Sequence, residues 1–218
     1  MRSKLVGLVA VILMLAAAAW AAGDTSALHP PPGSRIALVV FEDLECPACA
    51  HAEPLLEQAE RNYGLPLVRH DFIIPTHKWS MEAHIMARYF DAHPTAQSPR
   101  LGEEFREYIF ANQPMIYPPT LREWADKFAA AHHTALPAFY DPTGALRAKV
   151  EADTLLGSQT GETGVRHTPT IYVVSDSKQE PFVEVTDQNK LFDTIEQVKA
   201  SLPPEPVAKS KSRAKKKS

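Results

Sequence analysis

Residues 36–49 read IALVVFEDLECPAC, an apolar run that ends shortly before the only two cysteines of the 218-residue chain. The run is continuous and partly β-branched, which favours a buried central strand over a short helix. The cysteines are separated by two residues, the spacing at which neighbouring thiols form one small disulfide ring. At a helix start, the first thiol faces unpaired backbone N–H groups that favour its thiolate. We therefore expect Cys46 to attack and Cys49 to resolve.

Two other interpretations of the cysteine pair stay open at this point: half of a structural zinc site, or a purely structural disulfide. A tetrahedral zinc site needs two further thiolates or imidazoles. The chain has nine histidines, but no closely spaced histidine pair accompanies a second cysteine pair. The sequence therefore predicts redox chemistry that needs no metal and no organic cofactor.

The N-terminus is typical of an export signal. Arg2 and Lys4 precede an apolar run over residues 5–20, and Ala19 and Ala21 are small residues around a cleavage point. Residues 1–21 are therefore predicted to be a signal peptide, with an uncleaved N-terminal membrane anchor as the alternative, because the run is nearly long enough to span a bilayer. In either case we expect a periplasmic or other extracytoplasmic location, where disulfides persist.

The charge of the chain is unevenly distributed. The formal net charge is −3, yet six of the 23 Lys and Arg residues lie within the last ten positions. Residues 203–218 are predicted to be a Pro-rich linker and a disordered basic tail, since closely spaced prolines end a helix and the tail has little apolar surface to bury. The tail is either a solubilising segment or a contact for an anionic membrane surface. Nucleic acid is not an expected partner.

The rest of the pattern predicts an α/β chain with a helical block inside it. Apolar residues recur at helical spacing in the middle of the chain, and Pro-rich breaks divide that region into separate helices. The elements expected after the apolar run are a helix over 49–63, a strand over 65–74, a helical region over 77–161, strands over 170–174 and 182–185, and a helix over 191–202.

Two motifs resemble the DsbA-like class of thioredoxin-fold proteins. They are FEDLECPAC over residues 41–49 and GVRHTPT over residues 164–170. The resemblance covers residues 35–201 and implies a thioredoxin fold with an inserted helical domain. The implied segments are an N-terminal extension (22–34), a first half with the cysteine pair (35–76), the inserted helical domain (77–163) and a second half with a cis-proline (164–202).

The resemblance also implies roles for residues near the cysteines. Pro169 would be cis and pack beside the disulfide, and the backbone of Thr168 would pair with an extended substrate. Pro47, Ala48 and His167 are the candidates for tuning the redox properties. Strongly oxidising relatives commonly carry histidine where this chain has Ala48, so we expect a weaker oxidant unless His167 supplies the missing positive charge.

One position departs from the pattern of this class. Related enzymes often place a buried carboxylate six residues before the first cysteine, where it moves the proton of the resolving thiol, and here that position is Val40. Glu42, Asp43 and Glu45 are nearer in sequence, but at a strand end we expect them to be solvated. The base stays unidentified at this stage.

These observations predict an exported thiol-disulfide oxidoreductase, more an oxidase than a reductase or isomerase. The single cysteine pair and the lack of an obvious dimerisation segment favour an oxidase over an isomerase. It would exchange disulfides with unfolded or cysteine-containing exported polypeptides and use a membrane redox partner. One alternative is a copper-handling module with Cys46, Cys49 and either His167 or His51 as soft ligands. The other is a non-catalytic thioredoxin-like binding module.

Overall fold

The structure is a computed structural model that describes residues 23–203. The predicted signal peptide or anchor and nearly all of the predicted tail lie outside these residues. Within residues 23–203, no helix is long and apolar enough to cross a membrane. The elements are β1 (Ile36–Glu42), α2 (Pro47–Tyr63), β2 (Leu67–Asp71), α3 (Ser80–Ala92), α4 (Leu101–Asn112), η1 (Gln113–Met115), α5 (Leu121–Ala131), α6 (Ala145–Gln159), β3 (Thr170–Ser175), β4 (Phe182–Glu184), η2 (Gln188–Lys190) and α7 (Leu191–Ser201).

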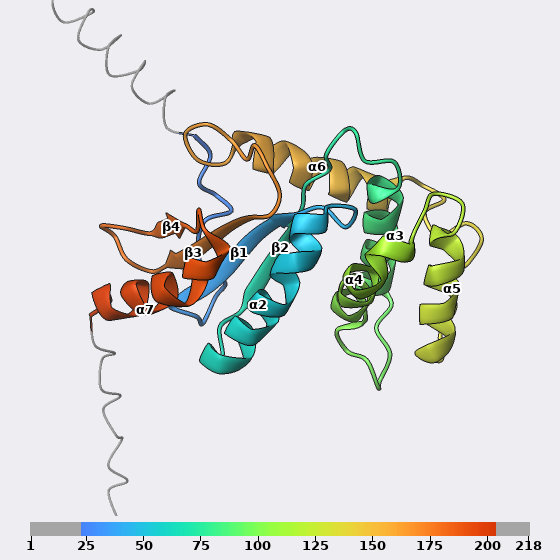
Figure 1. Ribbon diagram of the computed structural model, residues 1–218, viewed down its shortest axis with the longest axis horizontal. Helices are drawn as coiled ribbons and strands as arrows, with labels where there is room; N and C mark the ends of the chain where they lie inside the picture. Colours follow the sequence, from blue (N-terminus) through green and yellow to red (C-terminus); the bar gives the residue numbers. More distant parts are fainter. Residues whose placement is uncertain (1–22, 204–218) are drawn as a thin grey trace, which may run out of the picture.

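The strands form one four-stranded sheet in the order β2-β1-β3-β4 (Figure 1). β1 pairs in parallel with β2 and antiparallel with β3, and β4 lies antiparallel to β3. All seven residues of β1 are buried, as predicted for a central strand. β2 is shorter than the predicted strand over 65–74, because its partner β1 ends at Glu42, opposite Asp71.

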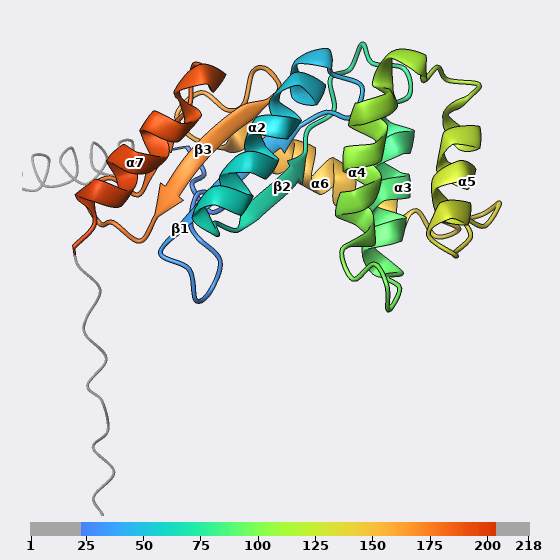
Figure 2. The same ribbon diagram turned by 60° about the horizontal axis from the view of Figure 1, so that its bottom comes forward.

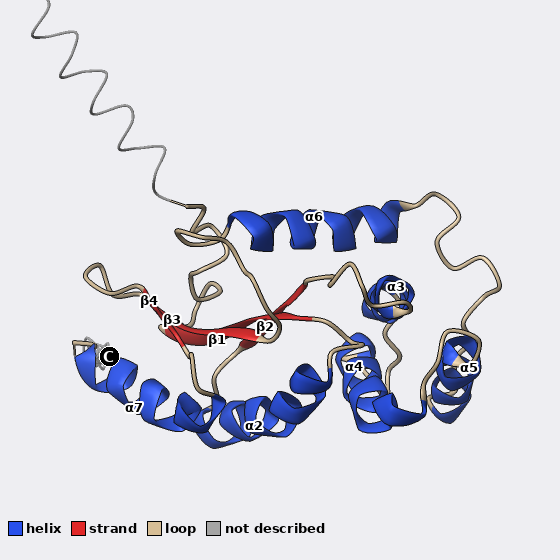
Figure 3. Ribbon diagram, turned by 45° about the horizontal axis from the view of Figure 1, so that its top comes forward, coloured by secondary structure: helices blue, strands red, loops and turns tan. Residues whose placement is uncertain are grey.

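Helices cover both faces of the sheet (Figure 3). α2 and α7 lie on one face, where their apolar side chains pack against alternate residues of β1 and β3, including Leu38, Val40 and Ile171. α6 lies across the other face. It approaches closely at Gly157, where an added Cβ would lie 2.5 Å from the Phe72 ring and 2.9 Å from the Phe41 ring. Only glycine fits this crossing.

α3, α4 and α5 form a separate group of helices beside the N-terminal end of α2 (Figure 2). Their apolar core includes the rings of Phe90, Phe105 and Phe128, which contact one another in tilted and edge-to-face arrangements. The same apolar cluster extends to Cys46 and Cys49. The inserted helices therefore pack directly against the cysteine pair, and the predicted α/β fold with a helical block inside it is confirmed.

Candidate active site

Cys46 and Cys49 lie at the N-terminus of α2. Cys46 is the N-cap residue, with extended backbone torsions (φ −81°, ψ 119°), and Pro47 occupies the first helical turn, where the missing N–H costs nothing. Both cysteines are free thiols. Cys46 is 9% exposed and Cys49 is 2% exposed. Pro47 and Ala48 between them are exposed, and Cys46 is the more accessible cysteine of the buried pair.

The two thiols have pKa values that are displaced in opposite directions. A hydrogen bond from the Cys49 thiol, assisted by the side chain of Thr168 and by the backbone N–H groups of Cys49 and Ala48, lowers the pKa of Cys46 to about 5 against the effect of burial. Burial raises the pKa of Cys49 well above its ordinary value, and the neighbouring Cys46 raises it further. At neutral pH the pair therefore holds one thiolate and one thiol, which suits thiol-disulfide exchange.

The loop before β3 completes the surroundings of Cys46. The Thr168–Pro169 peptide bond is cis, as the resemblance implied. When it is protonated, the Cys46 thiol donates to the carbonyl oxygen of Thr168 at 3.3 Å, although 122 residues separate them in sequence. The hydroxyl of Thr170 donates to the carbonyl of His167 at 2.7 Å, which fixes the turn. The structure thus brings together the two motifs on which the resemblance depends.

His167 and His51 are both exposed. Among residues 23–203, neither ring forms a hydrogen bond with a cysteine, and His167 is not among the main groups that lower the pKa of Cys46. The backbone N–H of Ala48 does contribute, although its side chain cannot. A tuning role for His167 stays a prediction, which a His167→Ala variant with an unchanged Cys46 pKa would refute.

The expectation that Glu42 and Asp43 are solvated was wrong. Glu42 is 1% exposed and Asp43 is fully buried, because the inserted helices and the segment after β2 cover this end of β1. Glu42 accepts a hydrogen bond from Arg69 at 2.7 Å. Asp43 accepts one from the backbone N–H of Ile74 at 2.7 Å, and its own N–H donates to Cys49 Sγ at 3.5 Å.

Glu42 has the properties that were expected of a carboxylate at position 40. Side chains alternate along a strand, so Glu42 projects from the same face of β1 as Val40, toward α2. Burial raises the pKa of Glu42 to about 7, outweighing the attraction of Arg69. Its Oε1 atom is buried and has no hydrogen-bond partner within the described chain. The charge of Glu42 also raises the pKa of Cys49.

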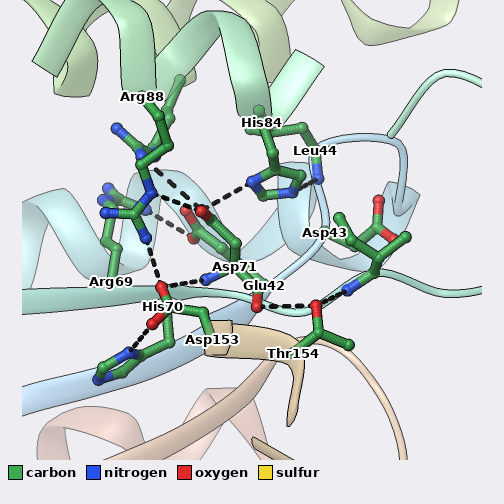
Figure 4. A network of polar contacts seen from close by, with 12 residues as sticks. Glu42, Asp43, Leu44, Arg69, His70, Asp71, His84, Arg88, Asp153 and Thr154 are labelled. Carbon is green, nitrogen blue, oxygen red and sulfur yellow. Dashed lines mark hydrogen bonds and ion pairs between the residues drawn. The ribbon is translucent and has the colours of Figure 1, made fainter. Parts of the chain in front are cut away.

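Sequence reasoning missed the buried charges that surround this site. Arg69 of β2 binds three carboxylates from three other elements: Glu42 at 2.7 Å, and Glu53 and Glu103 at 2.6 Å each. Asp71, which follows Arg69 by two residues on β2, contacts His84 and Arg88 of α3 at 2.8 and 2.6 Å (Figure 4). The available signal was the charged triplet Arg-His-Asp at 69–71, within an otherwise apolar strand. Its partners could be identified only with the topology in hand.

One group of acidic residues has the spacing of metal ligands. Carboxylate oxygens of Glu53, Glu57 and Glu107 lie within 4.8 Å of one another. Both carboxylate oxygens of Glu53 already accept hydrogen bonds from Arg69, at 3.0 and 2.6 Å. Within residues 23–203, no third metal-ligating side chain completes a cluster of this kind with Cys46 and Cys49.

The sheet order, the inserted helices and the cysteine pair beside a cis-proline together define a thioredoxin fold of the DsbA-like type. No family model matches the chain, and neither does any curated protein. Several solved structures, in contrast, match the chain. The chain is similar to oxidised BdbD from Bacillus subtilis, with a TM-score of 0.59 and 17% identity over 81% of this chain and 95% of that one.

Two further structures extend this likeness. DsbA2 from Pseudomonas aeruginosa matches with a TM-score of 0.56 and 16% identity over 82% of this chain and 96% of that chain. ScsC from Proteus mirabilis, in a transitional conformation, matches with a TM-score of 0.58 and 15% identity over 92% of both chains. These likenesses confirm the predicted fold, a thioredoxin fold with an inserted helical domain.

Proposed function

We propose that the protein is an exported thiol-disulfide oxidoreductase that exchanges disulfides with cysteine-containing polypeptides through Cys46. The observation that carries this proposal is the opposite displacement of the two thiol pKa values in one buried pair. Cys46 lies at the helix N-terminus, where the Cys49 thiol and the backbone N–H groups of Cys49 and Ala48 favour its thiolate, while Cys49 stays protonated beneath it. A purely structural disulfide has no need of this asymmetry.

In the oxidising direction, a substrate thiolate attacks the Cys46 sulfur of the Cys46–Cys49 disulfide. The S–S bond breaks, Cys49 leaves as a thiolate and takes up a proton, and a mixed disulfide remains at Cys46. A second substrate thiolate then attacks the substrate sulfur and releases Cys46 as its thiolate. The substrate loses two electrons and the pair gains them. A membrane redox partner would return the pair to the disulfide.

In the other direction, Cys49 resolves the mixed disulfide. It loses its proton, attacks the Cys46 sulfur and releases the substrate as a thiolate. The high pKa of Cys49 makes this step depend on a nearby base, and we propose Glu42 for that role. Glu42 is buried, its pKa of about 7 is close to neutral, and one of its oxygens has no other hydrogen-bond partner among the described residues.

The pKa of Cys46 favours an oxidase over a reductase. A stabilised thiolate stabilises the reduced form of the pair, which makes the disulfide a stronger oxidant. Its value of about 5 lies between the values of about 7 for thioredoxin and about 3.5 for DsbA. This intermediate value agrees with the weaker oxidant that Ala48 leads us to expect.

Trapping the intermediate tests the function. The Cys49→Ser variant should accumulate mixed disulfides with unfolded, cysteine-containing polypeptides, because a serine cannot resolve them. The Cys46→Ser variant should form none, although it keeps one thiol. Equal trapping by both variants, or by neither, would refute the proposed roles.

The copper-handling alternative receives no support from the geometry. Copper(I) would need soft ligands close to the pair. His167 and His51 are exposed, and among residues 23–203 neither joins the cysteines in a cluster with ligand spacing. Stoichiometric copper binding by the reduced protein, without disulfide transfer, would favour that alternative.

A further inference from the structure

The segment before Cys46 is held by side chains of the inserted helices. β1 ends at Glu42, and residues 43–46 cross from the sheet to α2. Leu44 is fully buried in this segment, so its backbone N–H and C=O groups both need partners. The N–H donates to Nε2 of His84 on α3 at 3.0 Å, and the C=O accepts from Nε2 of Gln113 on η1 at 2.9 Å.

Gln113 binds a second carbonyl in the same segment. Its Nε2 also donates to the carbonyl of Cys46 at 3.1 Å, so one amide group holds the carbonyls on either side of Glu45. The Cys46 carbonyl is at the same time the acceptor for the first helical N–H groups of α2, from Cys49 at 3.0 Å and Ala50 at 3.2 Å. Gln113 is 8% exposed, which strengthens both hydrogen bonds.

The orientation of the Cys46 carbonyl is coupled to the position of its sulfur. Both belong to the N-cap residue, whose backbone torsions place the side chain at the start of α2, close to the backbone N–H groups of Ala48 and Cys49 and to the Cys49 thiol. We propose that Gln113 is a positioning residue that holds Cys46 in the geometry that stabilises its thiolate. The inserted helices would then set the reactivity of the nucleophile. This inference rests on the proposed function of Cys46.

His84 supports the segment from the opposite side. Because Nε2 accepts the Leu44 N–H, Nδ1 carries the ring proton and donates to Asp71 at 2.8 Å (Figure 4). Asp71 also accepts from Arg88 at 2.6 Å, so the ring is fixed by the buried charges of β2 and α3. Gln113 is the better residue to change, since it forms no ion pair and its removal leaves these charges in place.

The test compares the pKa of Cys46 in the full-length protein and in two variants. Gln113→Met keeps the length of the side chain and removes both hydrogen bonds. We expect the Cys46 pKa, measured from the ultraviolet absorbance of the thiolate, to rise by about one unit, and the equilibrium constant with glutathione to change about tenfold, or about 30 mV toward a more negative potential. Gln113→Asn keeps the amide but reaches less far, so it should produce a smaller shift in the same direction.

Ser98→Ala is the matched control. It removes the hydrogen bond between Ser98 Oγ and His132 Nδ1, at 3.1 Å in the same inserted region, and should lower the unfolding temperature without moving the Cys46 pKa. The inference is overturned if the Gln113 variants lose stability as Ser98→Ala does while the Cys46 pKa and the glutathione equilibrium keep their wild-type values. An ordinary Cys46 pKa in the wild-type protein itself would overturn the proposed function as well, so the two failures are distinguishable.

Discussion

Replacing Cys46 by serine should change how the stability of the reduced protein depends on pH. The folded protein lowers the pKa of Cys46 to about 5, mainly through the hydrogen bond from Cys49, whereas a thiol in the unfolded chain has a pKa of about 8.5. A pKa that is lower in the folded state stabilises that state above the unfolded pKa, and this stabilisation is lost as the pH falls through the folded pKa. The contribution of Cys46 to the free energy of unfolding therefore changes with pH between about pH 8.5 and pH 5.

The size of the effect follows from this interval. Between pH 5 and pH 7 the folded protein holds a thiolate and the unfolded chain a thiol, and each pH unit contributes about 1.36 kcal/mol, which gives an upper limit of about 2.7 kcal/mol. Because Cys46 is the more accessible cysteine of the pair, solvent screening reduces this contribution, and we expect about 2 kcal/mol. At pH 4 the contribution should be close to zero.

The assay is urea unfolding of the wild type and of Cys46→Ser under reducing conditions at pH 4 and pH 7. Taking the difference between the two proteins at each pH cancels the other titrating groups, among them Glu42. The free-energy difference should grow in favour of the wild type by about 2 kcal/mol from pH 4 to pH 7. A difference that is the same at both pH values would show that the Cys46 thiolate is not stabilised, and the argument for a nucleophile at this position would fail.

Three further variants test the surroundings of the pair. Arg69→Met should lower the free energy of unfolding, measured in urea, by about 3–5 kcal/mol at neutral pH and by less at pH 4, because it leaves buried carboxylates without their cation. A loss of stability that does not depend on pH would contradict this. Glu42→Gln should slow the resolution of a preformed mixed disulfide near neutral pH, measured by rapid quench, and should change the Cys46 pKa little. An unchanged rate of resolution would exclude Glu42 as the base. Gly157→Ala should lower the free energy of unfolding, measured by thermal unfolding, by about 1–3 kcal/mol, since its Cβ would lie 2.5 Å from Phe72 and 2.9 Å from Phe41. Unchanged stability would mean that α6 can move away from the sheet.

The fold was predictable because its signals are local. The apolar run over 36–41, the cysteine pair at a helix start and the helical periodicity in the middle of the chain each depend on neighbouring residues. The proximity of Thr168 to Cys46 was predictable only through the resemblance, because 122 residues separate them. Composition and spacing alone carry no information on such a contact.

The polar surroundings of the site were not predictable for the same reason. Glu42 lies at the end of a strand, where solvent is the usual environment, and it is buried because α2, β2 and α4 all contribute residues to the cluster around it. Gln113 lies 67 residues from Cys46, in a short segment that has no motif. Such contacts depend on how the inserted helices pack, and packing follows from the whole set of apolar side chains.

The reduction potential of the Cys46–Cys49 pair, measured by equilibration with glutathione, tests the central claim most directly. A thiolate with a pKa between those of thioredoxin and DsbA predicts a potential between theirs, above about −270 mV and below about −120 mV. A potential of about −270 mV or lower would contradict the account, because the reduced form would then have no more stabilisation than in thioredoxin.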